Sequence, residues 1–454
     1  MARTRPQSFQ SAPRKRPAPR SSTAFMEGRK AVPPPKSVTI AGKKLPISPV
    51  LDTLFHFLAE RHRIHQRRIA GDPSPWTRDP ILAAYPFTNI FRVYDRTTQY
   101  ILRHVIQEGS SDLHESCFRV MLFRFFNKVE TWELLESSLG KVTWRDFSVR
   151  KYEEVLFSAE EALYCPAYII PAPKLGAKAN LSNHLRLVQL MMENDLPGHL
   201  EKVHHLKDAH GYLRLYPSMG DFTALQLLLD LNMLPHFNFS EDEWVALGPG
   251  ALECIRKIFG PSVRGSEGEA LTWLHSTQYS HFARMGITPD RIPRLCDSRP
   301  AGLTKVDFEH ALCEVEKYSR AKHPHIVGRR RNVAKSAFSP KREPLTATLP
   351  KHWLKPRHAP TTLSRPPPIK KGGSEEYEVS HIIAERQAGQ GYQYLVRWVG
   401  YGLEDDTWEP ESALEHTANL DEWKVTKIKI WDGVGDFQAM GNNFTRTRGF
   451  YTAK

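Results

Sequence analysis

Apolar residues recur every three or four positions across residues 47–68, with polar residues between them. This spacing gathers the apolar side chains on one face and predicts an amphipathic helix. The same periodicity predicts six more helices, at residues 89–107, 116–138, 184–194, 220–232, 241–247 and 305–320. Alternation typical of strands is scarce in this part of the chain. The sequence therefore predicts a mainly α, helical domain over residues 46–321.

The pattern changes to alternation of apolar and polar residues further along the chain. Residues 376–387 and 392–400 alternate in this way, and residues 407–410 form a third, shorter run. Glycines at 389 and 391 suit a tight turn between the first two runs, and residues 416–424 have the character of a closing helix. A small α+β domain is therefore predicted over residues 374–426, with a three-stranded sheet and a C-terminal helix. The tail, 427–454, receives no assignment.

The positive charge is concentrated in two proline-rich stretches. Residues 1–45 hold eleven lysines and arginines against one acid, and residues 322–373 hold thirteen against one, whereas residues 375–424 hold three against twelve. The basic stretches are predicted to be a disordered arm and a disordered linker. Such segments bind DNA phosphates through counterion release, and the clusters at 13–17 and 328–335 have nuclear-localisation composition. DNA contact and a nuclear location are predicted; alternatively, the charges only keep the segments solvated.

Several kinds of chemistry find no support in the sequence. The five cysteines are scattered without a CxxC pair, and the paired histidines lack cysteine or carboxylate partners at ligand spacing, so no metal site is expected. No apolar run approaches about 20 residues, so no membrane span is expected. The motifs GxxxxGK(S/T), GxSxG and HExxH are absent, which leaves a P-loop kinase, a nucleophile-elbow hydrolase and a zincin without support. No cofactor is predicted.

Three aromatic residues of the alternating segment, Tyr377, Trp398 and Tyr401, are candidates to box a methylated ammonium group. Such a group keeps its positive charge but loses hydrogen-bond donors, so aromatic faces bind it by cation–π attraction of roughly 0.5–2 kcal/mol per contact. The strings EEYEVSHII, YLVRWVGYG and DDTWEPE that carry or flank them resemble the chromodomain family, whose members read methyl-lysine on histone tails. The alternative is that the aromatic side chains only fill a small β core.

The resemblance to chromodomains also implies roles for neighbouring residues. Asp405 stands where the family often has an acid beside the ammonium, and Glu376 and Val379 would pair with the histone peptide as an added strand. The excess of acids suits a lysine- and arginine-rich tail. Ala413 is a departure, because the family often has there an asparagine that binds the peptide backbone. A methylated histone tail is the expected partner, and the lysine that is read stays open.

The helical domain carries several ordered motifs. Residues 216–232, YPSMGDFTALQLLLDLN, look like the hairpin and following helix that contact phosphates in helix-hairpin-helix DNA glycosylases. With residues 86–101, 118–132, 246–260 and 306–318, they resemble the helical domain of 5-hydroxymethyluracil DNA kinases, related to phage thymine pyrophosphorylases with a glycosylase-like fold. The resemblance implies contact with DNA at a modified thymine or uracil. The residues it implies for this contact are Asn89, Arg92, Asp95, Arg96, Gly220, Gln226, Gly248, Pro249, Gly250, Glu314 and Lys317.

Two aspartates compete for the role of a catalytic acid. Glycosylases use an aspartate to stabilise positive charge on the sugar as a flipped base departs. Asp230 lies in the hairpin-helix segment, whereas Asp242 lies nearer to the spacing found in glycosylases. Each also has a structural interpretation, Asp230 as an acid at a helix end and Asp242 as an acid at a helix N-terminus. Likewise, Arg92 and Asp95 suit a salt bridge along a helix, and residues 248–250 suit a helix stop.

Two functions follow from these features. In the first, a chromodomain anchors the chain to chromatin and the helical domain acts on a base in DNA. In the second, the helical domain is a non-catalytic platform for DNA or protein. A concave pocket around either aspartate would favour the enzyme, and exposure of both on a convex face would favour the adaptor.

Overall fold

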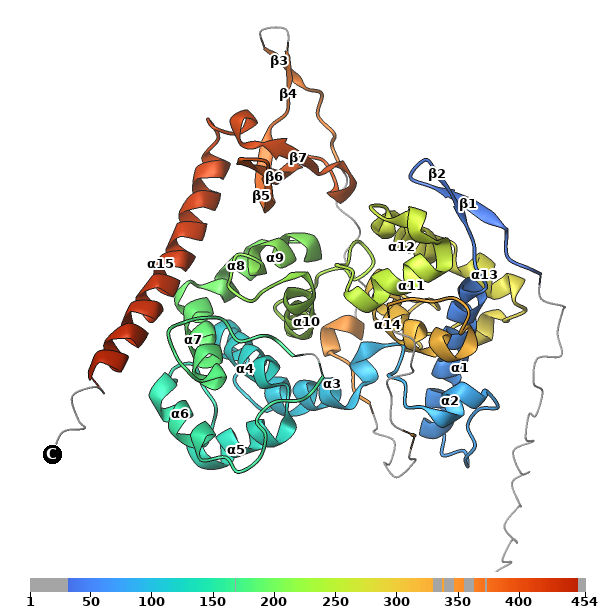
Figure 1. Ribbon diagram of the computed structural model, residues 1–454, viewed down its shortest axis with the longest axis horizontal. Coiled ribbons are helices and arrows are strands. Elements are labelled where there is room, and N and C mark those ends of the chain that lie inside the picture. Colours follow the sequence, from blue (N-terminus) through green and yellow to red (C-terminus); the bar gives the residue numbers. More distant parts are fainter. Residues whose placement is uncertain are drawn as a thin grey trace, which may run out of the picture.

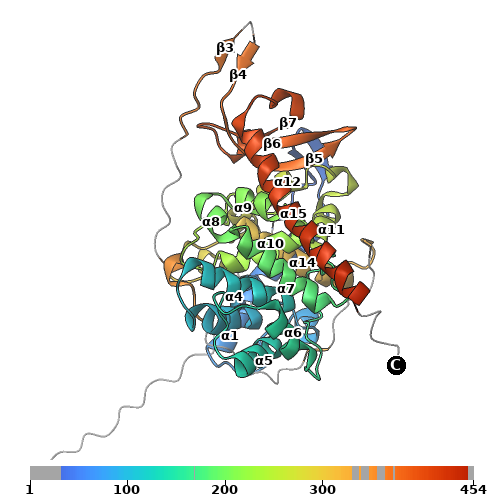
Figure 2. The same ribbon diagram turned by 90° about the vertical axis from the view of Figure 1, so that its left-hand side faces the viewer.

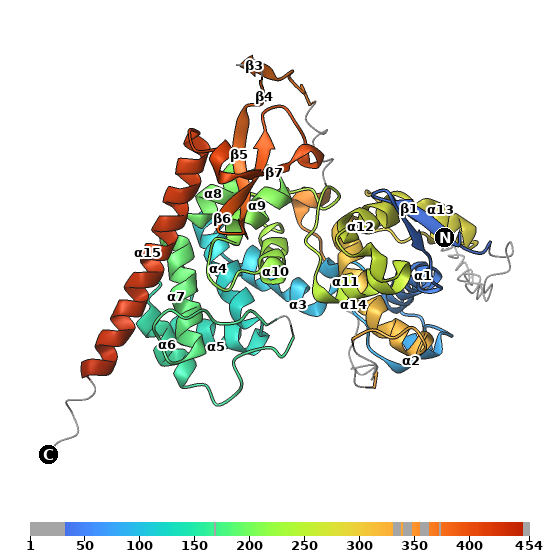
Figure 3. The ribbon, with the colours of Figure 1, turned by 45° about the horizontal axis from the view of Figure 1, so that its top comes forward.

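The computed structural model describes residues 32–167, 169–329, 337–338, 347–354, 363–371 and 374–447. Its helices form two groups joined through α3 (Arg96–Tyr100), and a small sheet lies against one of these groups (Figures 1 and 3). None of the described helices is both long and apolar enough to cross a membrane. The fold is mainly α with a small α+β domain, as the sequence predicts.

The first group of helices combines the beginning and the end of the helical domain. α1 (Val50–Ile69) contacts three helices that follow much later in the chain, and the ring of Phe55 meets Phe282 and Phe308 edge-on. Phe55 is one of the apolar residues that the periodicity of 47–68 places on the buried face. The other members of the group are α2 (Pro80–Ala84), α11 (Pro249–Phe259), α12 (Glu267–Ser276), α13 (Gln278–Arg284) and α14 (Lys305–Lys322), with short 3-10 turns at Pro261–Val263 and Pro289–Arg291.

The second group surrounds α4 (Leu113–Phe126), whose side chains from Ser116 to Phe126 are all buried. α4 contacts α7, α8 and α10. The group consists, besides α4, of α5 (Val129–Leu139), α6 (Val149–Phe157), α7 (Asn180–Glu193), α8 (Leu196–Lys202), α9 (Leu206–Leu213) and α10 (Asp221–Leu231). A 3-10 turn, Arg92–Tyr94, and a π-helical turn, Ile101–Gln107, flank α3.

Three of the predicted helices differ in detail from the structure. Residues 89–107 form a 3-10 turn, a short α-helix and a π turn in succession. Residues 116–138 are two helices, because Asn127 adopts a left-handed conformation that ends α4. Residues 241–247 form turns and irregular backbone, since tertiary contacts engage their polar groups: Glu241 accepts from Asn232 Nδ2 at 3.2 Å, and its carbonyl accepts from Val306 N. Tertiary contacts override a helical pattern of seven residues.

A hairpin lies inside the segment that was predicted to be a disordered arm, 1–45. β1 (Ser37–Ile40) pairs with β2 (Lys43–Pro46) in antiparallel register, and Ala41 and Gly42 turn with positive φ, as a two-residue hairpin loop requires. Ile40 and Leu45 are buried, and Lys43 Nζ donates to Arg264 O and Ser266 Oγ. Residues 37–45 are therefore ordered by packing on the helical domain. Residues 1–31 lie outside the described part of the chain.

The predicted three-stranded sheet is confirmed. β5 (Val379–Ala388), β6 (Gly391–Trp398) and β7 (Thr407–Pro410) pair antiparallel in that order, with short 3-10 turns at Leu403–Asp405 and Glu411–Ala413. A further two-stranded hairpin, β3 (Ile369–Lys371) with β4 (Ser374–Glu376), precedes the sheet.

The predicted closing helix is much longer than expected. α15 spans Ala418–Thr447 and so includes most of the tail that received no assignment. Its side chains Ile430, Val434 and Phe437 are buried, and Figure 2 shows it crossing the helical body in front of α7, which it contacts. Gln438 Nε2 donates to Lys174 O at 2.9 Å. The pattern of buried positions continues the helix beyond the chromodomain-like segment.

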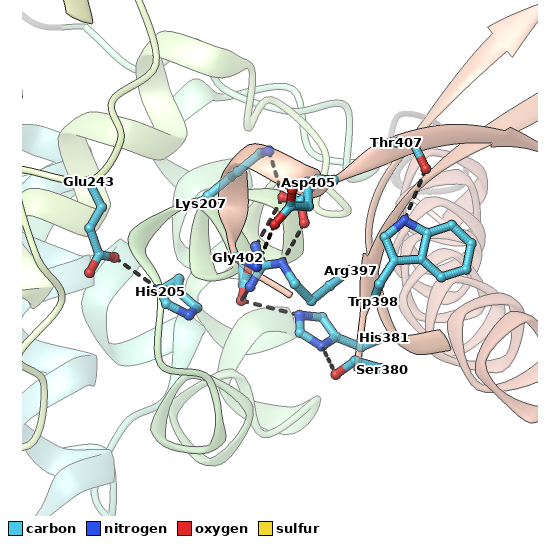
Figure 4. A network of polar contacts seen from close by, with 12 residues as sticks. His205, Lys207, Glu243, Ser380, His381, Arg397, Trp398, Gly402, Asp405 and Thr407 are labelled. Carbon is cyan, nitrogen blue, oxygen red and sulfur yellow. Dashed lines mark hydrogen bonds and ion pairs between the residues drawn. The ribbon is translucent and has the colours of Figure 1, made fainter. Parts of the chain in front are cut away.

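A buried network of charges joins the sheet to the helical body (Figure 4). Arg397 of β6 is buried and pairs with Asp208 of α9 at 3.1 Å and with Asp406. Lys207 of α9 pairs with Asp406 at 2.7 Å, and His381 of β5 contacts Asp208 at 3.1 Å. The two carboxylates thus face cations from both sides of the contact.

The protonation of these groups follows from their surroundings. Burial acts to raise the pKa of Asp208, but the hydrogen bond from His381 and the charge of Arg397 outweigh it and leave that pKa below its usual value. Burial acts to lower the pKa of Arg397, and the two carboxylates outweigh burial and raise it. Asp208 and Arg397 are therefore both charged at neutral pH. The backbones of α9 and β5 also lie close together, since a Cβ on Gly211 of α9 would lie 1.9 Å from Ile383 O of β5.

Part of the predicted linker, 322–373, packs on the helical domain. Residues 347–354 are described, and within them a 3-10 turn, Lys351–Leu354, buries Trp353. Gln99 of α3 forms hydrogen bonds with the backbone of Thr348. This stretch is held against the helices rather than free of them.

Candidate functional site

The three predicted cage residues come together at one corner of the sheet. The ring centroids of Tyr377 and Trp398 lie 6.0 Å apart at 61°, and those of Tyr377 and Tyr401 lie 5.8 Å apart at 81°. Tyr377 is 43% exposed and faces solvent, whereas Trp398 is partly buried and also packs against the hydrophobic core. Trp398 Nε1 donates to Thr407 Oγ1 at 3.1 Å, and Tyr401 Oη donates to Pro366 O at 2.7 Å. These bonds fix two of the rings in place.

The residues predicted around the cage have partners within the chain. Asp405 accepts from Gly402 N at 3.2 Å and pairs with Arg365 Nη2 at 3.1 Å. Glu376 lies in β4, opposite Ile369 of β3, so a strand of this chain already pairs with the residue that was predicted to bind the peptide. Val379 begins β5 opposite Trp398. Ala413 ends the 3-10 turn after β7.

Asp230 is a buried ion-pair partner. Its carboxylate is 0% exposed and lies between Arg92 Nη2, at 2.6 Å, and the guanidinium of Arg124. Both oxygens are therefore used inside the protein. Arg92 reaches across to Asp230 of α10, and its charge also acts to lower the pKa of Asp95.

The other residues of the 89–96 motif form a buried polar cluster. Asn89 N donates to Asp95 Oδ1 at 3.1 Å, and His310 of α14 contacts Asn89 O at 3.0 Å and Asp95 at 3.6 Å. Burial raises the pKa of Asp95, against the lowering effect of His310, and it lowers the pKa of His310. Glu314 accepts from Thr88 N at 3.1 Å. The cluster connects this turn to α14.

The remaining predicted residues are spread over several elements. Gly248 and Gly250 allow α11 to approach α14, since a Cβ would lie 2.8 Å from Glu309 Oε1 and 2.9 Å from Cys313 Sγ respectively. Their role is close helix packing. Gly220 begins α10 with open space around it. The others are Gln226, which is buried, Arg96, which is exposed, Lys317, which pairs with Glu314, and Pro249, the first residue of α11.

Asp242, in contrast, lines a cavity of about 330 Å³ between the two groups of helices. Its carboxylate is 54% exposed and lies 3.4 Å from His275 Nε2 of α12. The cavity also contains Arg92, so one predicted arginine and one predicted acid meet there. Of the two catalytic candidates, Asp242 alone lines this cavity, which occupies the low end of the size range of ligand pockets.

The cavity combines polar groups with apolar walls. Its charged and hydrogen-bonding residues include Arg92, Glu241, Asp242, His275, Gln278, Tyr279, Arg299, Thr304 and Asp307. Its apolar residues include Phe91, Leu229, Met233, Leu295, Leu303, Val306 and Trp353. Among the described residues, no three His, Cys, Asp or Glu side chains are placed to hold a metal ion. The lining thus mixes acids, arginines and neutral hydrogen-bonding groups with apolar side chains.

Asp307 is the most perturbed acid of the cavity. Burial and the charge of Glu241 raise its pKa to about 8, although hydrogen bonds from Thr304 act in the opposite direction. At neutral pH this carboxyl is mainly protonated. Sequence reasoning missed Glu241, Asp307 and Trp353. A tryptophan within a stretch of lysines and prolines is the signal that could have indicated Trp353, because tryptophan is rarely left in solvent without a role.

Comparison with known proteins identifies two regions of the chain. Residues 48–328 match the sequence family described as "5-hmdU DNA kinase, helical domain", and residues 377–425 match the "Chromo (CHRromatin Organisation MOdifier) domain". These matches confirm the resemblances to the helical domain of 5-hydroxymethyluracil DNA kinases and to chromodomains. The second region, with its sheet and closing helix, is a chromodomain.

Individual relatives are similar to one region or the other. A 5-hmdU DNA kinase of Bacillus phage SP10 is 23% identical over 261 residues, which are 52% of this chain and 40% of the kinase. The chromatin-associated protein SWI6 of Cryptococcus neoformans is 47% identical over 51 residues, 11% of this chain and 22% of SWI6. The human testis-specific chromodomain protein Y 1 is 57% identical over 42 residues, 9% of this chain and 8% of that protein. The chain thus spans less than half the length of each, and no solved structure gives a significant match.

The contrast between the two aspartates leads to a prediction about stability. Replacing Asp230 with Asn should lower the free energy of unfolding by about 3–5 kcal/mol, because two arginines would be left without their buried counter-charge. Asp242→Asn should change it by less than about 0.5 kcal/mol, since this side chain is half exposed. Urea denaturation followed by circular dichroism measures both. Equal and small effects of the two substitutions would contradict the structural role of Asp230.

Proposed function

Because the chain belongs to the family of the 5-hmdU DNA kinase helical domain and carries a chromodomain, we propose that it reads a methylated lysine on a histone tail and engages the DNA of the same chromatin. In this proposal it works in the nucleus. The chromodomain binds the methylated histone tail and so localises the chain to chromatin. The helical domain receives a modified thymine or uracil base in its cavity.

The convergence of Tyr377, Trp398 and Tyr401 carries the reading half of the proposal. The ring centroids of Trp398 and Tyr401 lie 6.0 Å and 5.8 Å from that of Tyr377, on an exposed corner of the sheet. A methylated ammonium needs aromatic faces arranged in this way. The acidic surroundings of this corner favour a basic peptide and speed its approach. Chromatin-associated relatives such as SWI6 of Cryptococcus neoformans support the same location.

The cavity around Asp242 supports the DNA half of the proposal. An enzyme acting on a base must extrude it from the duplex into a pocket that reads its edge. Here the charged side chains of Asp242 and Arg92 line the cavity beside apolar walls. The basic stretches 1–45 and 322–373 hold the DNA backbone without regard to sequence. The chain has none of the kinase P-loop sequence, so phosphoryl transfer is not part of the proposal.

A non-catalytic adaptor is the second candidate, and the burial of Asp230 favours it. Both oxygens of Asp230 are paired with arginines, so this acid supports the core rather than a charge that develops on a sugar. The adaptor would keep the cage and the DNA contacts. Release of a base distinguishes the two candidates, because only the enzyme leaves an abasic site in DNA carrying 5-hydroxymethyluracil.

Replacing Trp398 with Ala should weaken binding to a trimethyl-lysine histone peptide at least about tenfold, because one aromatic face of the cage is removed. Isothermal titration of histone-tail peptides, methylated and unmethylated, measures this. Tyr392→Ala is the matched control, since Tyr392 is an exposed aromatic residue at the far end of the same strand. Wild-type protein that binds both forms of every peptide equally would show that the cage does not read methylation.

Wild-type protein should bind a duplex with one 5-hydroxymethyluracil more tightly than the same duplex with thymine, and Asp242→Asn should reduce this preference about tenfold. The reason is that Asp242→Asn removes a charged acceptor from the cavity but leaves the fold undisturbed. Competition binding followed by fluorescence anisotropy gives the ratio, with Asp432→Asn on the exposed face of α15 as the control. Equal wild-type affinity for the two duplexes would refute base recognition and leave the adaptor.

A further inference from the structure

One wall of the cavity comes from a stretch that the sequence assigns to the linker. Trp353 lines the cavity and is 8% exposed, and its Nε1 donates to Asn232 O at the end of α10 at 3.3 Å. The other lining residues belong to the helical domain, between Phe91 and Asp307. Without Trp353 the cavity would be open on this side.

A pair of reciprocal hydrogen bonds holds this stretch in place. Thr348 N donates to Gln99 Oε1 at 2.8 Å, and Gln99 Nε2 donates to Thr348 O at 2.9 Å. Gln99 is 1% exposed, and its Nε2 also donates to Val93 O at 2.6 Å. The side-chain amide thus satisfies the backbone N–H and C=O of one residue in an irregular segment, in the way a neighbouring strand would. A buried amide leaves donors and acceptors unsatisfied if the segment departs, at a cost of several hydrogen bonds.

The charge of the cavity indicates what kind of group it takes. Glu241, Asp242 and Asp307 stand against Arg92 and Arg299, so there is no excess of positive charge to attract a phosphate. With Asp307 mainly protonated, the lining is close to neutral. Apolar walls with a few polar groups are typical of sites for a flat, neutral, hydrogen-bonding group.

We propose that residues 347–354 form a strap that completes this cavity, and that Trp353 is the aromatic wall against which a single extrahelical pyrimidine base lies. This inference rests on the proposed function. Aromatic walls stabilise unstacked bases by replacing the stacking that is lost from the duplex. The reciprocal bonds of Gln99 make it a positioning residue, which sets where the wall stands without touching the base.

The strap also connects the two functions along the chain. It lies between the helical domain and the chromodomain in sequence, and its docking holds Trp353 at the end of α10. The path left to the chromodomain is therefore shorter than the predicted linker of residues 322–373.

The test uses the full chain and a duplex with one 5-hydroxymethyluracil next to 2-aminopurine, whose fluorescence rises when its neighbour leaves the stack. Trp353→Ala should reduce the preference for this duplex over the thymine duplex about tenfold and abolish the rise. Trp353→Phe keeps an aromatic wall and should stay within about threefold of wild type. Trp431→Ala, on the exposed face of α15, should behave as wild type.

A second pair of variants moves the strap without changing the cavity lining. Thr348→Pro removes the N–H that donates to Gln99, whereas Thr348→Ala keeps it. The proline variant should show the same loss as Trp353→Ala, and the alanine variant should not. Circular dichroism establishes that each variant is folded.

The outcomes separate the inference from the proposed function. Suppose that the wild type prefers the modified duplex and that Trp353→Ala and Thr348→Pro show the same preference. Base recognition then stands, and the role of Trp353 as an aromatic wall is refuted. If wild type shows neither preference nor a rise in fluorescence, base recognition itself is refuted, and the wall with it.

Discussion

The buried guanidinium of Arg397, held between Asp208 and Asp406, determines how the two parts of this protein sit together. Arg397 and Asp406 belong to the chromodomain, and Asp208 belongs to α9 of the helical domain. A buried charge is tolerated when its partners are in place, and losing one partner costs about 3–5 kcal/mol. Lys207 and His381 complete the network from the two sides. The chromodomain is therefore docked on the helical domain and is not a freely tethered module.

Three further contacts reinforce this constraint. α15 leaves the chromodomain and buries Ile430, Val434 and Phe437 on the body next to α7. Gly211 lets α9 approach β5 so closely that any side chain there would collide with it. The strap holds the chain between the domains against α3 and α10. In the proposed function, a chromodomain docked in this way would hold the aromatic cage and the cavity at one relative orientation, set by the fold rather than by the length of the linker.

The sequence pattern predicts helices and strands correctly where the buried positions recur periodically. The helical period of 47–68 and 305–320 and the alternation around residues 379–398 each reflect one buried face, and the structure has α1, α14 and the β5–β6 pair there. The cluster of three aromatic residues was predicted because the family motifs combine Tyr377 with Trp398 and Tyr401, which follow much later in the chain. The local sequence does not show that Asp230 is buried and Asp242 is exposed. Their surroundings depend on Arg124 and on α12 respectively, which the fold brings in from elsewhere.

The elements that were missed depend on long-range contacts. Residues 241–247 carry a helical pattern, but Glu241 is engaged by Asn232 and the segment follows the cavity wall instead. The stretch 347–354 has no periodic pattern that predicts packing, and it is ordered by Gln99 and by the burial of one tryptophan. Residues 37–45 are ordered by two apolar residues that meet the helical domain. In each case a few specific contacts outweigh composition.

The distance distribution between the two domains tests the fixed docking most directly. Spin labels at Glu154→Cys on α6 and Gln390→Cys at the β5–β6 turn, with the partly exposed native cysteines replaced by serine, report it by double electron–electron resonance. We expect a single narrow distribution that broadens when Arg397 is replaced by Ala. A broad distribution in the protein with Arg397 intact would show that the chromodomain moves independently and would contradict the account.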